Sequence, residues 1–474
     1  MNVWHQWVGD WVQRGLGDLP AVRFAGRTTT YAGLADLSAR AAGLLRRRGV
    51  GPGDRVLLVC SDALDALAAV LGALRRGAIS ILANPLSPRS DLEELAALSS
   101  PRLLVAAAPA AVESLPGGVP AMALGGLGGL EPVELSAEEP DAGVALAGPG
   151  DDAVWQPTLT EDGRTYLVRH PHRALAAGAS PFAVGRLEMT RQDRCLSVAK
   201  LCFGYGFGGS AAFPLATGAC SILHPGRSDV ASLMELVEQE RPTLFFGVPT
   251  FYSMMLRVPE LRARWDLRSV RLWISAGEAL APDLARRCED VLERPLVDGF
   301  GSTEMFHVFL SEVPGERGLR ATPGHQLKVI DGAGREVADG EAGMLLARGP
   351  HCGTGYAGEA EASREVFLDG GWVRVGDRFR RRPDGLFVWE GRGDELVKVG
   401  GQKVSPRQLA AEARGYPGAV SASVRVEPAE DGRTELRLVM TFEQGRAPDP
   451  AEVRRWVRGR VLPHKVPRYI EVRS

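Results

Sequence analysis

The sequence lacks the features of an exported or membrane-bound protein. Its six cysteines, at positions 60, 195, 202, 220, 288 and 352, are scattered and include no Cys-x-x-Cys pair. This spacing predicts reduced, mostly buried thiols rather than disulfides. The chain does not start with a basic region followed by an apolar core, and no apolar run reaches the length of a membrane span. We therefore expect a cytoplasmic protein without a membrane partner.

Positive charge is not concentrated anywhere in the chain. The formal net charge is −2, from 56 Lys and Arg against 58 Asp and Glu, and there is no basic block. This argues against nucleic acid or an anionic membrane as a partner. His170 and His172 lie close together but have no nearby cysteine or third histidine, so we expect no zinc site. Lysine is rare, and its five positions are 200, 328, 398, 403 and 465.

The chain is long, and its sequence indicates a regular alternation of strands and helices. Its 474 residues are enough for a large core and for more than one domain. Strands alternating with helices predict a parallel α/β sheet covered on both faces. The expected elements are a helix over 34–48, a strand over 55–60, a helix over 63–76 and a strand over 78–82. Residues 114–150 are rich in Gly, Pro and Ala and predict a surface connection with one or two strands.

The residue types that carry chemistry gather in residues 298–310, which read Asp-Gly-Phe-Gly-Ser-Thr-Glu-Met-Phe-His-Val-Phe-Leu. The glycines permit a tight turn and close approach of the backbone to a ligand. Ser302 and Thr303 offer hydroxyls to an anion, and Glu304 is a hard oxygen ligand of the kind that Mg²⁺ uses beside phosphates. His307 can donate or accept a hydrogen bond. The alternative is a purely structural turn between two strands.

This segment resembles a motif of the adenylate-forming superfamily, which includes acyl- and aryl-CoA ligases, adenylation domains and luciferases. Gly-Ser-Thr-Glu is similar to the family's Tyr-Gly-x-Thr-Glu, and Ser-Thr-Glu-Met-Phe-His is similar to the benzoate-CoA ligase branch. The resemblance implies catalytic roles for Thr303, Glu304 and His307, with Glu304 as the Mg²⁺ ligand and His307 lining an aryl pocket. It also implies that the nucleotide contacts Asp298, Gly299, Phe300, Gly301, Ser302 and Thr303.

A second stretch, residues 195–224, runs from an apolar strand through a turn of glycines and aromatics into a helix. It resembles the Ala-Lys-Leu-Phe-Phe-Ala-Tyr-Gly of aryl-CoA ligases, which forms one wall of the aryl pocket. The implied substrate contacts are Lys200, Phe203, Gly204, Tyr205 and Gly206, together with Gly301 and His307. Gly204 stands where the benzoate enzymes have alanine, which would leave room for a ring substituent.

Further motifs imply a nucleotide site. In the family, the loop at Ser275, Ala276, Gly277 and Glu278 borders the adenine and the aryl group. Residues 371–377 resemble Trp-x-x-Thr-Gly-Asp, whose aspartate, here Asp377, binds both ribose hydroxyls. A carboxylate suits a diol because it can accept two hydrogen bonds.

A hinge motif indicates the domain organisation. Residues 391–401 resemble Gly-Arg-x-[Asp/Lys]-x-x-Ile-Lys-x-x-Gly, which implies a hinge at Asp394 and a ribose and phosphate contact from Arg392. We expect an α/β protein with a large N-terminal domain of layered α/β subdomains, 1–390, and a small mobile α+β domain, 391–474. The loop at Gly400 and Gly401 would face the site in a second domain arrangement, near a pantetheine tunnel.

Two elements that handle ATP in the family differ here. In residues 155–173 the family's phosphate loop is represented only by Thr158 and Gly163, with Glu161 and Asp162 in place of hydroxyls and Tyr166 in place of the lysine. Two carboxylates would repel a triphosphate. The family's C-terminal Pro-x-Thr-x-x-Gly-Lys has no counterpart in the 474 residues, and none of the five lysines has an equivalent sequence context.

The resemblance implies an ATP-dependent ligase that activates an amino- or hydroxybenzoate-like acid as aryl-AMP. The acceptor would be CoA, a carrier protein or another nucleophile, and the chain could form a homodimer. Three alternatives stay open at this point. They are other chemistry at the same site, such as amide formation or ATP-dependent diazotisation of an aryl amine; an enzyme that uses a preformed adenylate; and a non-catalytic protein that binds an aryl ligand or nucleotide. The altered loop favours the non-catalytic protein, and the retained acids and Arg392 favour the enzyme.

Overall fold

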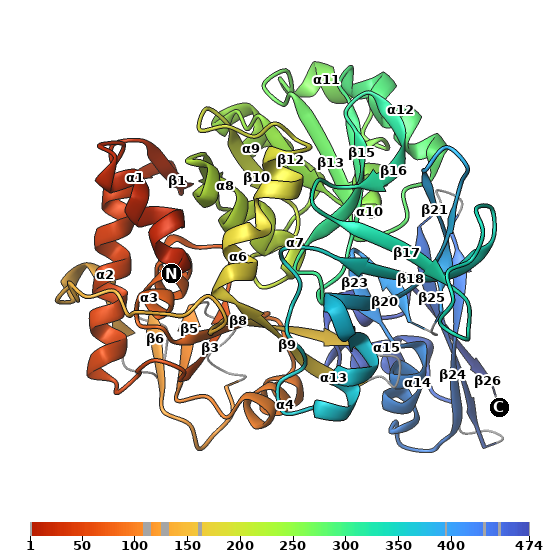
Figure 1. Ribbon diagram of the computed structural model, residues 1–474. Helices are drawn as coiled ribbons and strands as arrows, with labels where there is room; N and C mark the ends of the chain where they lie inside the picture. The colour runs from red at the N-terminus through yellow and green to blue at the C-terminus, as the bar shows by residue number, and fades with distance from the viewer. Residues whose placement is uncertain are drawn as a thin grey trace.

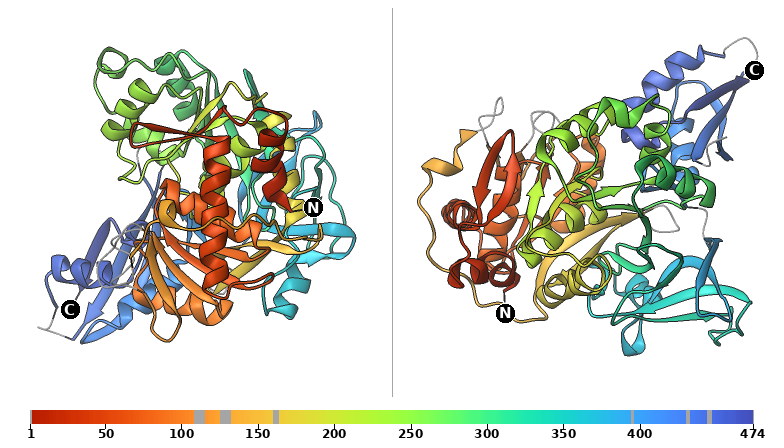
Figure 2. Two further views of the ribbon diagram at one scale, coloured as in Figure 1. Left: turned by 90° about the vertical axis from the view of Figure 1, so that its left-hand side faces the viewer. Right: turned by 90° about the horizontal axis from the view of Figure 1, so that it is seen from above.

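The computed structural model describes residues 2–107, 115–124, 132–159, 164–393, 396–429, 433–443 and 447–473 (Figure 1). Two large sheets with flanking helices form most of the molecule, and a smaller C-terminal segment, drawn in blue, stands at one side in both views of Figure 2. The predicted α/β class is confirmed. Within the described ranges, no helix is long and apolar enough to cross a membrane.

The first sheet has seven strands in the order β7-β6-β5-β3-β4-β8-β9, with only the β8–β9 pair antiparallel. Its strands are β3 (Arg55–Cys60), β4 (Ile79–Ala83), β5 (Leu103–Ala107), β6 (Ala121–Leu124), β7 (Pro132–Val133), β8 (Asp152–Leu159) and β9 (Thr165–Pro171). Its helices are α2 (Tyr31–Arg47), α3 (Leu64–Arg75) and α4 (Arg89–Ser99). The predicted alternation of strands and helices is thus confirmed, and β6 and β7 are the strands expected within the surface connection.

The beginning of α2 differs from the predicted one for a local reason. The Thr30 hydroxyl accepts a hydrogen bond from the Gly33 amide at 3.1 Å, so the helix is capped three residues earlier than its apolar pattern indicates. Small residues then let α2 and α3 approach closely. A Cβ added to Gly72 would lie only 2.6 Å from the Ala41 Cβ.

The second sheet changes from parallel to antiparallel along its length. Strands β11, β10, β12, β13 and β14 pair in parallel, and β15 then pairs antiparallel with β14. The strands of the parallel part and its edge are β1 (Pro20–Phe24), β2 (Arg27–Thr30), β10 (Arg194–Ser197), β11 (Cys220–Ile222), β12 (Leu244–Gly247), β13 (Leu272–Ala276) and β14 (Leu296–Gly301). The antiparallel part contains β15 (Val308–Val313), β16 (Glu316–Ala321), β17 (Gln326–Ile330), β18 (Ala342–Arg348), β19 (Phe367–Leu368), β20 (Trp372–Arg381) and β21 (Phe387–Arg392).

The helices associated with this second sheet are mostly short. They are α6 (His172–Gly178), α7 (Gly204–Phe207), α8 (Phe213–Thr217), α9 (Val230–Glu240), α10 (Pro249–Met255), α11 (Leu261–Arg264), α12 (Pro282–Leu292) and α13 (Ala360–Val366). A π-helical turn, Gly208–Ala212, joins α7 to α8. The helix α1 (Asp10–Gln13) lies near the N-terminus.

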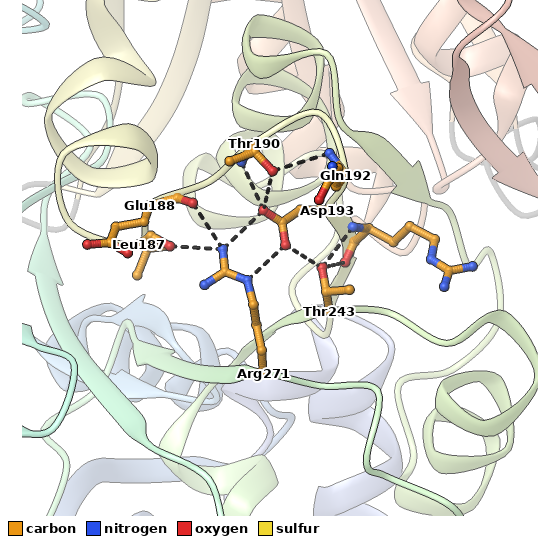
Figure 3. A network of polar contacts seen from close by, with 8 residues as sticks. Leu187, Glu188, Thr190, Gln192, Asp193, Thr243 and Arg271 are labelled. Atoms are coloured by element: carbon orange, nitrogen blue, oxygen red, sulfur yellow. Dashed lines mark hydrogen bonds and ion pairs between the residues drawn. The ribbon is translucent and has the colours of Figure 1, made fainter.

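A buried carboxylate ties together the starts of three parallel strands (Figure 3). Asp193, just before β10, accepts hydrogen bonds from Arg271 Nε at 2.9 Å and from the Thr243 hydroxyl at 2.6 Å. Thr243 and Arg271 stand just before β12 and β13. The Arg271 guanidinium also donates to the Leu187 carbonyl at 2.9 Å. This network fixes the amino ends of the strands and leaves their carboxyl ends for ligands, as is usual in open α/β sheets.

The C-terminal segment has its own small core. It contains the hairpin β22 (Val397–Val399) and β23 (Gln402–Val404), the strands β24 (Ala419–Pro428), β25 (Thr434–Phe442) and β26 (Tyr469–Arg473), and the helices α14 (Pro406–Arg414) and α15 (Pro450–Arg458). Leu409, Leu438, Met440 and Val453 pack together in an apolar cluster separate from those of the large sheets. The hinge residue Asp394 lies outside the described residues, and the division at residue 391 stays a prediction.

Candidate functional site

A cavity of about 1060 Å³ lies at the carboxyl ends of the parallel strands and extends to the C-terminal hairpin. Ligands of open α/β sheets bind at this edge. Ten of the predicted site residues line it: Lys200, Phe203, Gly204, Tyr205, Ala276, Gly277, Gly301, Ser302, Thr303 and His307. The C-terminal hairpin contributes Lys398, Gly400, Gly401, Gln402 and Lys403 to the same wall. The structure therefore brings together the predicted aryl wall, the Ser-Thr turn and the Gly400–Gly401 loop.

The other predicted site residues are not among those that line this cavity. They are Gly206, Ser275, Glu278, Asp298, Gly299, Phe300, Glu304, Asp377 and Arg392. Glu278, for example, accepts hydrogen bonds from the Thr250 amide at 2.9 Å and the Thr250 hydroxyl at 3.0 Å. These bonds hold the first turn of α10, so the Glu278 carboxylate has a structural role in this arrangement.

The turn at the centre of the site connects β14 to β15. Phe306 adopts a left-handed conformation with φ of 65°, which costs a non-glycine residue about 1–2 kcal/mol. The Phe306 amide donates to the Thr303 carbonyl at 2.9 Å, and the His307 amide donates to the Met305 carbonyl at 2.7 Å. These bonds hold the strained turn, which points the neighbouring Glu304 and His307 side chains to different surroundings.

His307 forms part of an aromatic wall. Its ring lies 5.4 Å from the Tyr205 ring and 4.4 Å from the Phe213 ring, between centroids. It also occupies the space over Gly208, where an added Cβ would meet His307 Cδ2 at 2.2 Å. Burial lowers the pKa of His307 to about 4, so the ring is neutral at physiological pH. Its Nε2 lies 3.2 Å from the Tyr205 carbonyl oxygen, and its Nδ1 has no hydrogen-bond partner.

Gln156 was not predicted from the sequence, yet it lies in the same wall. It extends from β8, is 3% exposed, and has no hydrogen-bond partner for either amide atom. A Cβ at Gly204 would lie 3.3 Å from Gln156 Oε1. The space expected to accept a ring substituent is thus bordered by a side-chain amide. A glutamine within the mostly apolar run 153–159 is the signal that could have identified it.

Glu304 is buried, and one of its carboxylate oxygens makes several polar contacts. Oε1 accepts from the Tyr356 hydroxyl at 3.2 Å and from the Thr158 hydroxyl at 3.4 Å, and Lys403 Nζ lies 3.7 Å away. Burial alone would raise the pKa of Glu304, but the Lys403 charge, hydrogen bonds from its own backbone and Ser302, and the Arg392 charge lower it. Oε2 has no partner and remains a potential oxygen ligand.

Tyr166, which stands at the position of the family's phosphate-binding lysine, is packed rather than turned toward a ligand. It is 6% exposed on β9, and its ring lies 5.0 Å from that of Tyr356. Tyr356 in turn donates its hydroxyl to Glu304. The aromatic pair therefore supports the Glu304 carboxylate from behind. Glu161, Asp162 and Gly163 of the predicted loop lie outside the described residues.

Asp377 and Arg392 form a buried ion pair on adjacent strands. Arg392 Nη1 donates to Asp377 Oδ2 at 2.8 Å, and Trp389 Nε1 donates to Oδ1 at 2.9 Å. Both carboxylate oxygens are thus engaged, although each can accept one further hydrogen bond from a diol. Nearby, the Lys398 ammonium stands 5.1 Å from the centre of the Phe300 ring. Burial lowers the pKa of Lys398, and the Asp377 charge opposes this.

Asp298 is a buried acid on β14, in register with Ser275 on β13. Burial, followed by the charge of Glu312, raises the pKa of Asp298 well above its usual range. Its Oδ1 has no hydrogen-bond partner among the described residues. A carboxyl with a raised pKa takes up negative charge less readily, which suits an uncharged heterocycle better than a phosphate.

The residues fit a magnesium ion that is shared with phosphates. In the part of the chain that the structure describes, no group of three or more His, Cys, Asp or Glu could hold a metal by itself. Glu304 offers one free carboxylate oxygen. Mg²⁺ is commonly held by one or two carboxylates plus substrate phosphates, so a site at Glu304 needs a nucleotide to complete it.

Comparisons with known proteins agree with this arrangement. Residues 10–357 match the family described as AMP-binding enzyme. The chain is 31% identical over 466 residues to a 4-hydroxybenzoate–CoA/benzoate–CoA ligase of Rhodopseudomonas palustris, covering 94% of this chain and 86% of the relative. A benzoate-CoA ligase structure from Burkholderia xenovorans is 30% identical, with a TM-score of 0.77, over 100% of this chain and 96% of that one. An amide bond synthetase from Marinactinospora thermotolerans shares the fold, with a TM-score of 0.89 at 23% identity, over 100% and 95% of the two chains.

Proposed function

Because the chain belongs to the AMP-binding enzyme family, we propose that it is an ATP-dependent ligase that activates an aromatic carboxylic acid as an aryl adenylate. One observation carries this proposal. A single cavity joins the aromatic wall of Phe203, Tyr205 and His307 to the hydroxyl-bearing turn of Ser302 and Thr303. A planar acid on the aromatic wall would therefore present its carboxylate to a nucleotide held at the turn. The similarity to aryl-CoA ligases supports the same substrate class.

The reaction needs no covalent bond to the protein. A carboxylate oxygen of the acid attacks the α-phosphorus of ATP, the bond from that phosphorus to the bridging oxygen breaks, and pyrophosphate leaves. The contribution of the chain is positioning and charge stabilisation. Thr303 and Ser302 donate hydrogen bonds from their hydroxyls to phosphate, the Asp377–Arg392 pair binds ribose, and Asp298 binds the base. Mg²⁺, with Glu304 as its protein ligand, would neutralise phosphate charge.

For the second step, we assign CoA as the acceptor, and an amine or a carrier protein is the alternative. The thiol attacks the acyl carbon of the adenylate, and AMP leaves. The loop at Gly401 fits this role because it borders the cavity beside Gly277, where an added Cβ would lie 3.2 Å from the Gly401 Cα. In this proposal the chain divides at residue 391, with Asp394 as the hinge.

The proposed substrate carries an amino or hydroxyl group on its ring. The unpartnered amide of Gln156 and the unpartnered Nδ1 of His307 support this choice. Leaving a buried polar group without a partner costs about 1–3 kcal/mol, and a polar substituent would remove that cost. Benzoate itself would leave both groups unpaired.

The test is pyrophosphate release with Mg²⁺–ATP and a panel of benzoate, aminobenzoates and hydroxybenzoates, followed by addition of CoA or hydroxylamine. We expect one acid to give pyrophosphate and a trapped acyl product. Thr303→Val should reduce kcat by about 10²-fold, because a donor to transition-state charge is lost. Lys328→Met, on β17 and not among the residues that line the cavity, is the control for general effects on the protein. Absence of pyrophosphate with every acid would contradict the ligase assignment.

A non-catalytic binding protein is the second candidate, and Tyr166 is the observation that favours it. Its packed ring stands where the resemblance gives a phosphate-binding lysine. Isothermal titration of ATP with Mg²⁺, AMP and the acids separates the two functions. Binding of an acid without binding of a nucleotide at millimolar concentration would support the binder.

A further inference from the structure

Lys403 reaches from the C-terminal hairpin into the polar cluster around Glu304. Its ammonium donates to the Thr158 hydroxyl at 3.1 Å and to the Leu159 carbonyl at 3.4 Å, and it lies 3.7 Å from Glu304 Oε1. The Lys403 side chain is 16% exposed and the Glu304 side chain 5%. This contact joins β23 to β8 and to the turn after β14.

The position of Lys403 relative to the cavity matters as much as these distances. Lys403 lines the cavity, whereas Glu304 does not. Glu304 also contacts the uncharged Thr158 and Tyr356, and the Arg392 charge acts on it from beyond ion-pair distance. Lys403 is therefore the only charged group within ion-pair distance of Glu304 among the described residues.

A buried carboxylate requires a positive partner, because an isolated charge in a low-dielectric interior is strongly unfavourable. Lys403 supplies that partner in this arrangement. In the proposed adenylation step, Glu304 instead holds a divalent cation. Both cations need the same carboxylate, and two positive charges at that distance would repel each other.

We infer that Lys403 and a divalent metal ion bind Glu304 alternately, so that Lys403 acts as a mobile counter-charge. This inference rests on the proposed function. When the hairpin is docked, the Lys403 ammonium neutralises Glu304 and excludes the metal. Metal and triphosphate bind when the hairpin withdraws, and departure of metal and pyrophosphate lets Lys403 return. The cavity wall formed by Gly401 is then complete for the acceptor step.

The expected magnitude follows from the population of the docked state. If nine-tenths of the molecules have Lys403 on Glu304, the apparent metal affinity is reduced about tenfold. Replacing Lys403 by an uncharged residue should therefore raise the apparent metal affinity by about the same factor. Arginine at the same position should preserve the competition, since its charge is permanent.

The test measures Mn²⁺ binding to the full chain by electron paramagnetic resonance, in the presence of ATP and in the absence of any acid. We expect Lys403→Ala and Lys403→Gln to bind Mn²⁺ about five- to tenfold more tightly than the unmodified protein. Lys403→Arg should resemble the unmodified protein. Lys328→Met, which removes an ammonium packed on Trp372 and not lining the cavity, should have no effect. Glu304→Gln should abolish the gain from Lys403→Ala in the double variant.

Unchanged or weaker Mn²⁺ binding by both Lys403 variants, with normal melting temperatures, would overturn the inference. A gain that persists in the Glu304→Gln background would overturn it too, because the competition would then lie elsewhere. The readout is independent of turnover. If the protein forms no aryl adenylate but the Lys403 variants bind Mn²⁺ more tightly, the proposed function fails and this inference stands.

Discussion

At the residue scale, the wall of the cavity contains buried polar groups that have no hydrogen-bond partner among the described residues. Gln156 lies over Gly204, and His307 lies over Gly208. The two glycines are one helical turn apart in α7 and the π-helical turn that follows it, so the two side chains lie along one face of this segment. At Gly208 an added Cβ would overlap the His307 ring, whereas at Gly204 it would press on the Gln156 amide at 3.3 Å. Unpaired polar groups of this kind favour a ligand that can satisfy them.

Replacing Gln156 with leucine should therefore change substrate preference rather than abolish activity. We expect the ratio of kcat/KM for the best amino- or hydroxybenzoate to that for benzoate to fall about tenfold, because a hydrogen bond to the substituent is lost. Gln192→Leu, at an exposed position outside the cavity, is the matched control. Equal loss for both acids would indicate a structural effect of Gln156 and would refute its role in specificity.

At the scale of elements, the parallel strands are held at one end and open at the other. Burial alone would raise the pKa of Asp193, but hydrogen bonds from Arg271, Thr243 and Thr190 outweigh it and lower the pKa. The unfolded state then binds a proton more readily than the folded state does. The stabilisation is present above the unfolded pKa of about 4 and is lost as the pH falls through the folded value.

We expect Asp193→Asn to reduce the free energy of unfolding by about 2–3 kcal/mol at neutral pH, since charge-assisted hydrogen bonds are lost. Urea denaturation monitored by fluorescence measures this difference. The difference should shrink as the pH falls below about 4, where the unmodified aspartate is also neutralised. Glu93→Gln, in the exposed pair with Arg89 on α4, should change stability by less than about 0.5 kcal/mol. An effect of the same size in both variants would contradict the argument.

At the scale of the whole molecule, buried neutral histidines surround the central turn. His351 Nδ1 lies 2.5 Å from the Met305 carbonyl oxygen, and its ring lies 4.5 Å from that of His325. The His170 ring packs 5.4 Å from Phe306. Burial lowers the pKa of His170 and of His351 to about 3, and that of His325 to about 4. A fall in pH therefore affects both the residues around the site and the stability of the fold.

Stability should consequently fall as the pH decreases from about 6.5 toward 4, because the unfolded histidines take up protons that the folded ones do not. Each such histidine contributes a slope of about 1.4 kcal/mol per pH unit. Asp62 acts in the opposite direction, because burial raises its pKa to about 6. Denaturation at pH 7, 6 and 5 should show the fall, and His325→Gln should reduce its slope. A flat profile over this range would contradict the prediction.

The sequence by itself determined the class of fold and the location of the site along the chain. The alternation of strands and helices in residues 55–83 follows from local periodicity. The turn at 298–310 follows from its glycine, hydroxyl-bearing and acidic residues, which are adjacent in the chain. The motifs around Gly204, Ser302 and Asp377 indicated the family for the same reason. Helix and strand limits differed by a few residues where a cap such as Thr30 acted.

Only the tertiary structure decided which of these residues meet. The approach of Lys403 to Glu304, the burial of Tyr166 against Tyr356, and the place of Gln156 beside Gly204 all join distant parts of the chain. Such contacts depend on how sheets and hairpins pack and on the direction of each side chain, which local patterns do not specify. For the same reason, sequence spacing did not identify Lys403 as the counter-charge of the central glutamate.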